Sequence, residues 1–535
     1  MKSLLPLLFA LIVAGAAADP ETGTPAAPEA RPVDELMLAL ATASFRDKEN
    51  LVTQIAASGD PRVPALLQAL LDGTLHSDAA TGAIVAIAAD GTMTPLAGPA
   101  RADAPRDELR RIATNNGLRS QLRPLIAATQ LQSPDAAARR QAARTLTGTT
   151  QTALLPVLER ALAAETDADA RAALAVARAS LALASPDAAA RNAAVAVLAE
   201  TSDTAILTLL EQHADVETDG AVKASLAAAI ARMHSREKLF AFVADLFFGL
   251  SLGSVLLLAA VGLAITFGVM GVINMAHGEM IMLGAYTTYV TQLLMPNHID
   301  WSLAVAVPAA FVVTALVGVL IERSVIRFLY GRPLETLLAT FGISLVLQQL
   351  VRTIFSPLNK SVASPPWLSG SWEINGMLSL TYNRLYIVLF ALAVLAGLIA
   401  ILRRTPIGLQ MRAVTQNRAM ASAMGIRTGW VDAMTFGLGS GIAGIAGVAL
   451  SQLTNVGPNL GQSYIIDSFL VVVFGGVGNL LGTFVAAMGL GVVTKFAEPL
   501  AGAVLAKILI LVFVILFIQR RPRGLFALKG RFVED

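Results

Sequence analysis

The sequence predicts an all-α protein in two parts: an N-terminal α-solenoid domain, then a polytopic transmembrane helical domain. Three observations support this fold class. Hydrophobic residues make up 55% of the 535 residues and charged residues only 15%, whereas soluble domains carry about 25% charged residues. Apart from the N-terminus, the long apolar runs all follow residue 240. A 52-residue repeat lies before that point.

Charge and composition exclude several classes of function. The formal net charge is +2, so there is no electrostatic case for nucleic-acid binding. The chain has no Cys, which excludes disulfides, thiolate catalysis and cysteine-ligated zinc. His76, His213 and His234 are isolated in the sequence, and no nucleophile–base set is visible. We therefore expect no metal site, no cofactor and no catalytic residues.

Residues 1–18 read as a signal peptide. Lys2 gives a short positive region, an apolar stretch covers Leu4 to Val13, and Ala16 to Ala18 offers an A-x-A cleavage site. The alternative is an uncleaved anchor. Either arrangement places the following residues outside the cytoplasm, which in a bacterium means the periplasm. Residues 19–33 are rich in Pro, Ala and Glu and are interpreted as a linker.

Residues 34–240 are predicted to form the helical repeat domain. The run Ser133 to Arg139 recurs 52 residues later as Ser185 to Arg191. Ser133 is expected to cap a helix whose first residue is Pro134. Helices that cannot each bury a face alone stack into a solenoid, and residues 59–64 resemble the start of a HEAT-type repeat. Residues 84–88 and 92–96 predict an inserted β-hairpin. The domain is interpreted as a docking surface or as a spacer.

Residues 241–535 are predicted to form the transmembrane domain. A span needs about 20 apolar residues, and nine segments are candidates: 245–268, 274–295, 301–321, 335–354, 384–403, 431–453, 465–478, 481–498 and 502–519. The seventh is short and joins the eighth through a glycine turn at 475–479. The pair forms two full crossings or one re-entrant hairpin, giving nine spans or seven.

Basic residues predict the orientation of these spans. Three clusters follow the third, fifth and last segments, and cytoplasmic loops are enriched in such residues. With an external N-terminal domain and an odd number of spans, all three clusters lie inside. We therefore expect a multi-pass protein of the bacterial inner membrane, surrounded by lipid, with its N-terminal domain in the periplasm. The clusters are Arg323, Arg327 and Arg332; Arg403, Arg404, Arg412, Arg418 and Arg427; and Arg520, Arg521, Arg523, Lys529 and Arg531.

The cytoplasmic stretch from Arg404 to Trp430 predicts a docking loop. Small residues from Asn417 to Met424 favour a short helix, and Gly425 is a typical helix stop. A basic helix between two spans suits a soluble partner. An ordinary positively charged loop is the alternative.

This stretch resembles the coupling loop of the branched-chain amino acid and urea permease family of ABC importers. Residues 267–279 resemble the family's opening motif, residues 473–479 its glycine turn, and residues 518–526 its tail. The resemblance covers nearly all of residues 245–530. Within the family, residues 455–462 and 501–507 are most similar to the urea permease subunit, and plain amino acid permeases lack the N-terminal domain.

The resemblance implies a urea importer with several partners: a periplasmic substrate-binding protein, a second permease subunit and two cytoplasmic ATPase subunits. The chain itself lacks a phosphate-binding loop, because no Gly-Lys pair occurs in it. It is therefore expected to be a transport subunit and not an enzyme. Rival interpretations are a permease for branched-chain amino acids or short amides, a passive urea or ammonium channel, and a membrane-anchored scaffold.

Three sets of residues carry these expectations, although each path residue also has a purely structural interpretation, such as helix capping by Asn274. A path for a neutral solute needs hydrogen-bonding groups inside the membrane, where polar residues are rare. The candidate path residues are Asn274, His277, Glu279, Thr340, Asn455, Asn459 and Gln462. The ATPase-coupling loop is represented by Arg412, Asn417, Arg418, Ala419 and Gly425, and the glycine turn by Gly475, Gly476 and Gly478.

Overall fold

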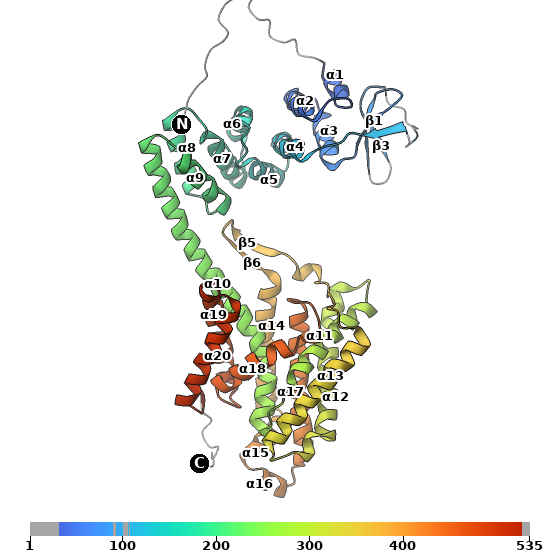
Figure 1. Ribbon diagram of the computed structural model, residues 1–535, viewed down its shortest axis with the longest axis vertical. Helices are drawn as coiled ribbons and strands as arrows, with labels where there is room; N and C mark the ends of the chain where they lie inside the picture. The colour runs from blue at the N-terminus through green and yellow to red at the C-terminus, as the bar shows by residue number, and fades with distance from the viewer. Residues whose placement is uncertain (1–31, 89–91, 100–104, 106–107, 527–535) are drawn as a thin grey trace, which may run out of the picture. The chain divides into compact units, whose positions relative to one another are not determined.

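The computed structural model describes residues 32–88, 92–99, 105 and 108–526. The predicted signal peptide, most of the linker, and Lys529 and Arg531 lie outside the described residues. The chain divides into two compact units, 1–198 with 217–225, and 199–216 with 226–535. Figure 1 gives the order of their elements.

The first unit begins with three helices and a small sheet. The helices are α1 (Val33–Ala39), α2 (Phe45–Ala57) and α3 (Val63–Asp72). The strands are β1 (Leu75–Asp78), β2 (Ile84–Ile87), β3 (Met93–Ala97) and β4 (Leu109–Arg111), in the antiparallel order β3-β2-β1-β4. The predicted hairpin is confirmed as β2–β3. The all-α assignment was too narrow, because β1 and β4 are short and carry little of the alternation that marks a strand.

Helices fill the rest of the N-terminal region. They are α4 (Asn116–Gln130), α5 (Ala136–Leu146), η2 (Thr152–Leu154), α6 (Leu155–Ala164), α7 (Ala168–Ala182), α8 (Ala188–Ala199) and α9 (Thr204–Val216). Within the first unit, α5 packs on α4 and α7, and α6 packs on α7. Next comes α10 (Gly220–Met270), which continues without a break through residue 240, the predicted domain boundary.

The 52-residue repeat extends to side-chain contacts. Arg139 makes a bidentate pair with Glu165 at 2.7 Å, and Arg191 pairs in the same way with Glu217 at 2.9 Å. Each arginine also donates to the two backbone carbonyls just before its helix, and each glutamate accepts from the next two backbone amides. The helix cap differs from prediction. Asp135 caps α5 in place of Ser133, because its two carboxylate oxygens accept from the amides of Ala137 and Ala138.

The second unit carries the membrane helices. These are α11 (His277–Leu294), α12 (Ile299–Ser324), α13 (Pro333–Phe355), α14 (Tyr382–Arg404), α17 (Thr428–Ser451), α18 (Gln462–Gly475), α19 (Leu480–Ala501) and α20 (Ala503–Arg520), together with the second half of α10. The connections hold η3 (Ile326–Phe328), η4 (Pro366–Leu368), the hairpin β5 (Ser371–Asn375) and β6 (Leu378–Thr381), α15 (Pro406–Gln416) and α16 (Arg418–Ala423). Each of the nine predicted segments coincides with a helix. Among the described residues, seven helices are long and apolar enough to span a membrane; α11 and α18 are not among them.

The centre of this unit is built from α11, α12 and α17, which make the most extensive helix contacts. Glycines permit this closeness. A Cβ on Gly284 would lie 2.1 Å from the carbonyl oxygen of Gly444, and one on Gly447 would lie 2.0 Å from that of Ile281. The glycines of α17 therefore serve close helix packing.

A contact with α10 fixes where α11 begins. His277, the first residue of α11, contacts the carbonyl oxygen of Ala259 through Nε2 at 2.9 Å. Ala259 lies 11 residues before the end of α10, which is about 17 Å along a helix and about half the ~30 Å hydrocarbon thickness. The backbone between α10 and α11 therefore returns about three helical turns along α10 before α11 begins.

A matching break occurs at α18. Its N-terminal neighbour Gly461 lies against Gly278, since a Cβ on Gly461 would lie 1.8 Å from the Gly278 carbonyl oxygen. At its other end, Gly478 in the following turn contacts Gly268 near the end of α10. The 14-residue α18 therefore covers only part of the length of α10, whereas α19 returns along α10 past the contact of Gly491 with Gly253 to the ring pair of Phe496 and Phe242. By length and composition, α19 is able to span a membrane and α18 is a shorter apolar helix.

Candidate functional site

A polar stripe on α13 faces the start of α11. Thr336, Thr340, Ser344, Gln348 and Arg352 recur at every fourth residue, so they share one face of the helix. The first four are buried, whereas the opposite face exposes Leu334, Leu338, Leu345 and Val346. A polar face inside an apolar helix costs free energy unless it contacts protein or a solute path.

Glu279 of α11 is the acceptor at the centre of this stripe. Ser344 Oγ donates to Glu279 Oε1 at 2.9 Å, and Gln348 Nε2 donates to the same oxygen at 2.8 Å. The side chain of Glu279 is buried, and its Oε2 has no hydrogen-bond partner in the described part of the chain. A buried carboxylate oxygen without a partner leaves room in the hydrogen-bonding network for a further donor.

Asn274 and Thr340 hold the non-helical backbone before α11. Asn274 Oδ1 accepts from the amide of Ala276 at 3.0 Å, and Thr340 Oγ1 accepts from the amide of Met275 at 3.1 Å. These contacts satisfy backbone groups that would otherwise be unpaired between the two helices. The local capping role expected for Asn274 is therefore present. His277 points to α10 instead of the stripe, through its contact with Ala259.

Of the remaining candidate path residues, one lies at the end of the stripe and two are exposed. Asn459 Oδ1 accepts from Arg352 Nη2 at 2.8 Å, which brings Asn459 to the end of the stripe. Asn455 and Gln462 are exposed and lie outside this network. Sequence reasoning missed Ser344, Gln348 and Arg352. The period-four spacing of polar residues in the fourth segment was the signal that could have found them.

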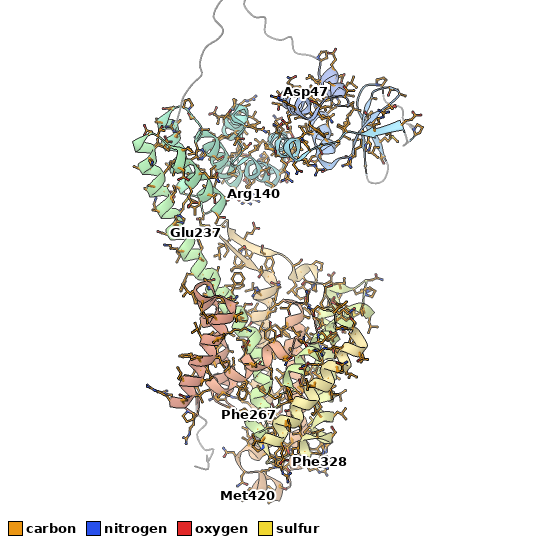
Figure 2. The ribbon with its side chains drawn as sticks, in the orientation of Figure 1. Asp47, Arg140, Glu237, Phe267, Phe328 and Met420 are labelled. Atoms are coloured by element: carbon orange, nitrogen blue, oxygen red, sulfur yellow. The ribbon has the colours of Figure 1, made fainter. Side chains whose placement is uncertain are left out.

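The predicted docking loop forms two helices at one end of the membrane unit. Figure 2 labels Phe267 at the end of α10, Phe328 in η3 and Met420 in α16, all towards that end. Asn417 Oδ1 caps α16 through the amide of Met420 at 2.9 Å. Gly425 ends it with φ +87°, and the amide of Ile426 returns to the carbonyl of Ala421 at 3.1 Å. The helix and its glycine stop are confirmed.

Two arginines of this loop are fixed to neighbouring helices. Arg418 pairs with the buried Asp432 of α17, and its guanidinium lies 4.1 Å from the ring centre of Tyr330. Tyr330 donates its hydroxyl to Asp432 Oδ1 at 3.0 Å, and burial, with the nearby Asp432 carboxylate, raises the pKa of Tyr330. Arg412 donates to the carbonyl of Leu402. These contacts hold the backbone of α16 in place.

The outer surface of the loop is apolar and exposed. Ala419 is exposed, and Met420 and Met424 are 60% and 77% exposed. Methionine adapts its shape to a partner surface. The fixed backbone and exposed methionines make this loop a suitable protein-docking surface.

The glycine turn joins α18 to α19 against the C-terminal tail. Gly476 and Gly478 have φ of +105° and +80°, which L side chains rarely adopt. A Cβ on Gly475 would lie 2.5 Å from the carbonyl oxygen of Gly482. The amide of Phe526 donates to the Gly475 carbonyl at 3.2 Å. These glycines permit a tight backbone crossing and lie apart from the polar stripe.

Comparisons with known proteins agree on the membrane unit. The family described as "Branched-chain amino acid transport system / permease component" matches residues 246–518. The branched-chain amino acid permease protein BraD of Pseudomonas aeruginosa is 29% identical over 54% of this chain and 96% of its own length. LivH of Escherichia coli is 32% identical over 50% of this chain and 89% of its own. A probable LivH of Methanocaldococcus jannaschii is 25% identical over 51% of this chain and 88% of its own. No solved structure matches the chain significantly.

Proposed function

The chain belongs to the branched-chain amino acid transport permease family, and from this premise we propose that it is the membrane-spanning subunit of an ATP-driven importer of a small polar solute. The observation that carries the proposal is the polar face of α13 set against Glu279 within an otherwise apolar bundle. We infer that this face lines part of the solute path, as buried polar residues in membrane helices commonly do.

Energy would come from separate subunits. The α15–α16 loop would dock a cytoplasmic ATPase, with Met420 and Met424 in the contact and Asn417, Arg418 and Gly425 fixing its shape. The curated relatives are named as permease proteins of transport systems. A complete importer would therefore contain this chain, a second permease subunit, two ATPase subunits and a substrate-binding protein.

The N-terminal region would lie in the periplasm as a HEAT-like solenoid, with the membrane unit in the bacterial inner membrane. The duplicated Arg139–Glu165 and Arg191–Glu217 pairs support stacked repeats. The cation–π contact of Arg323 with Trp430 supports a common side for the first two basic clusters. In this arrangement the repeat domain would dock the substrate-binding protein or act as a spacer.

Branched-chain amino acids are the first candidate substrate. The relatives with the greatest coverage of the membrane unit are named for these solutes. Because only about one residue in three is identical, the few side chains that determine solute specificity can differ between this chain and these relatives.

Urea is the second candidate, on two specific observations. Residues 34–240 fall outside the family match and outside most of the length shared with the relatives. The stripe also offers neutral hydroxyl and amide groups at Thr340, Ser344 and Gln348, which suit a small neutral solute with several hydrogen bonds.

Uptake of radiolabelled leucine and urea by a strain lacking this chain tests the proposal. Restoration of leucine uptake by the wild-type chain would identify an amino acid importer, and restoration of urea uptake alone would identify a urea importer. A partner ATPase disabled in its phosphate-binding loop should abolish the restored uptake. Persistent uptake in that strain would instead support a passive channel and refute the proposal.

A further inference from the structure

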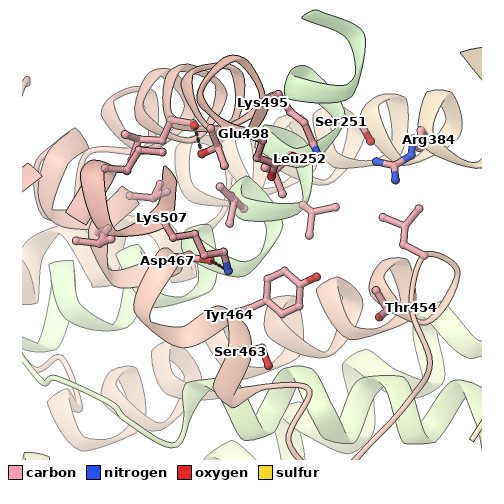
Figure 3. A pocket seen from close by; sticks show the side chains of 18 residues that line it. Ser251, Leu252, Arg384, Thr454, Ser463, Tyr464, Asp467, Lys495, Glu498 and Lys507 are labelled. Atoms are coloured by element: carbon pink, nitrogen blue, oxygen red, sulfur yellow. Dashed lines mark hydrogen bonds and ion pairs between the residues drawn. The ribbon is translucent and has the colours of Figure 1, made fainter. Parts of the chain in front are cut away.

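A second polar feature of the membrane unit is a cavity of about 280 Å³ between α10, α14, α18, α19 and α20. Ligand pockets for drug-sized molecules span roughly 300–1,000 Å³, so this volume suits a smaller solute. Figure 3 shows its polar lining, which includes Ser251, Arg384, Tyr464, Asp467, Glu498 and Lys507.

Two hydrogen-bond donors in this lining lack acceptors. Ser251 is fully buried in α10, and its Oγ has no hydrogen-bond partner in the described part of the chain. Arg384 packs its guanidinium on the ring of Phe248 at 5.1 Å, and no carboxylate of the described residues lies within ion-pair distance of it. A guanidinium carries five N–H donors. An oxygen-bearing ligand in the cavity would satisfy the guanidinium of Arg384.

The lining also provides acceptors held in place by lysines. Lys507 Nζ lies 3.2 Å from Asp467 Oδ2, and Lys495 Nζ lies 2.5 Å from Glu498 Oε2. Each lysine thus engages one oxygen of its carboxylate, and a carboxylate has a second oxygen that can accept from a ligand N–H. The cavity therefore combines free donors at Arg384 with fixed acceptors at Asp467 and Glu498.

We propose that this cavity is a binding site for the transported solute, and that it recognises an oxygen acceptor placed next to N–H donors. This chemistry is shared by α-amino acids and urea. Arg384 would hold the oxygen, and Asp467 and Glu498 would accept from the nitrogen. The inference rests on the proposed transport function.

The cavity and the polar stripe lie on either side of the start of α18. Tyr464, which lines the cavity, is three residues after Gly461, whose backbone contacts Gly278 beside Glu279. A lipid phosphate is the other oxygen-bearing ligand that Arg384 could attract, and the occupancy test below distinguishes it from the solute.

The absence of Cys from the chain permits a direct test of occupancy. Single substitutions Ser463→Cys and Thr454→Cys place an accessible thiol in the lining, and Ser361→Cys places one on an exposed loop outside it. In cells expressing the complete importer, a small methanethiosulfonate reagent would be applied with and without solute. Protection of the lining thiols by leucine alone or by urea alone would support the site and identify which solute binds there. Equal labelling with and without either solute, at all three positions, would overturn it, as would protection only by added anionic lipid.

Substitution of Arg384 separates the two solutes by charge. If the solute carries a carboxylate, Arg384→Gln should raise KM for uptake about tenfold or more, as expected from losing a hydrogen bond between charged groups. Arg384→Lys should keep most of the wild-type affinity. If the solute is neutral urea, Arg384→Gln should keep more of the wild-type affinity than Arg384→Lys, because the glutamine amide keeps a neutral donor. The matched control is Lys360→Gln, outside the lining. Unchanged KM in both Arg384 variants would refute the site. Loss of uptake by the wild-type chain would instead refute the transport function.

Discussion

The guanidinium of Arg418 pairs with the buried carboxylate of Asp432, and this pair ties the first residue of α16 to α17. Tyr330 contacts both partners, by a hydrogen bond to Asp432 and by its ring to Arg418. Three separate segments of the chain therefore meet at the base of the predicted docking loop.

We expect Asp432→Asn to weaken transport more than assembly. The amide keeps an acceptor for Tyr330 but removes the charge that holds Arg418, so α16 loses its fixed position. Uptake should fall about tenfold, equivalent to ~1.4 kcal/mol in a rate constant, while the amount of protein in the membrane stays close to wild type. Uptake and ATP hydrolysis would be measured on the same vesicles.

The matched control for this pair is Arg332→Gln. Arg332 also forms an ion pair, with Glu335 at 3.1 Å, but both side chains are more than half exposed, and such pairs contribute little. Equal losses of uptake in the two variants would contradict a specific role for Asp432.

The conformation of Gly425 predicts a second outcome. Its φ of +87° strains any L side chain, yet nothing lies within 4 Å of a Cβ built there. Gly425→Ala should therefore cost about 1–2 kcal/mol of loop stability from the backbone alone, and reduce coupling between ATP hydrolysis and uptake. Gly429→Ala, in the helix after it and equally uncrowded, should behave like wild type. Wild-type coupling in Gly425→Ala would contradict the need for this helix stop.

The contact between Gly278 and Gly461 predicts a packing defect. A methyl group on Gly461 would overlap the Gly278 carbonyl, so Gly461→Ala should lower the melting temperature of the purified chain, with a cost of at least about 1–3 kcal/mol as in other overpacked cores. Gly489→Ala in α19 has open space around its Cβ and is the control. A melting temperature unchanged by Gly461→Ala would mean that the two helix starts are not in contact.

Acid should loosen the N-terminal repeats. The hydrogen bonds from Arg139 lower the pKa of Glu165 from 4.5 to about 2, and Arg191 does the same for Glu217. A carboxyl with a lowered folded-state pKa contributes stability that is fully present above pH 4.5 and is lost as the pH falls towards 2. Pulsed hydrogen exchange of peptides from α5 to α7 in the full chain should therefore show increasing opening across that window. Arg139→Gln should flatten the pH dependence in these peptides and leave the Arg191 peptides unchanged; the same pH dependence in both chains would exclude the pair as its cause.

Sequence patterns predicted the long apolar helices because hydrophobic length and glycine spacing are local properties. They also predicted the helix of the docking loop, since Asn417 and Gly425 act on the backbone beside them. The predicted path was less complete. Glu279 was identified by its charge, but Ser344 and Gln348 depend on which face of α13 meets α11, and that is a tertiary relationship.

Other differences have similar physical causes. Ser133 and Asp135 are both good caps, and only the backbone geometry selects Asp135. The position of α18 depends on contacts of Gly461 with Gly278 and of Gly478 with Gly268, which join residues far apart in the sequence. Asn455 and Gln462 carry suitable polar groups but lie outside the network that the helix packing creates.

The contact between Gly278 and Gly461 also bears on motion. Where two helices meet through side chains, rotamer changes can absorb a small displacement. Gly278 and Gly461 meet through their backbones, so no side chain between them can absorb a displacement of α18. A tilt of α18 imposed from its C-terminal end, where the tail and the glycine turn meet, would therefore shift the start of α11.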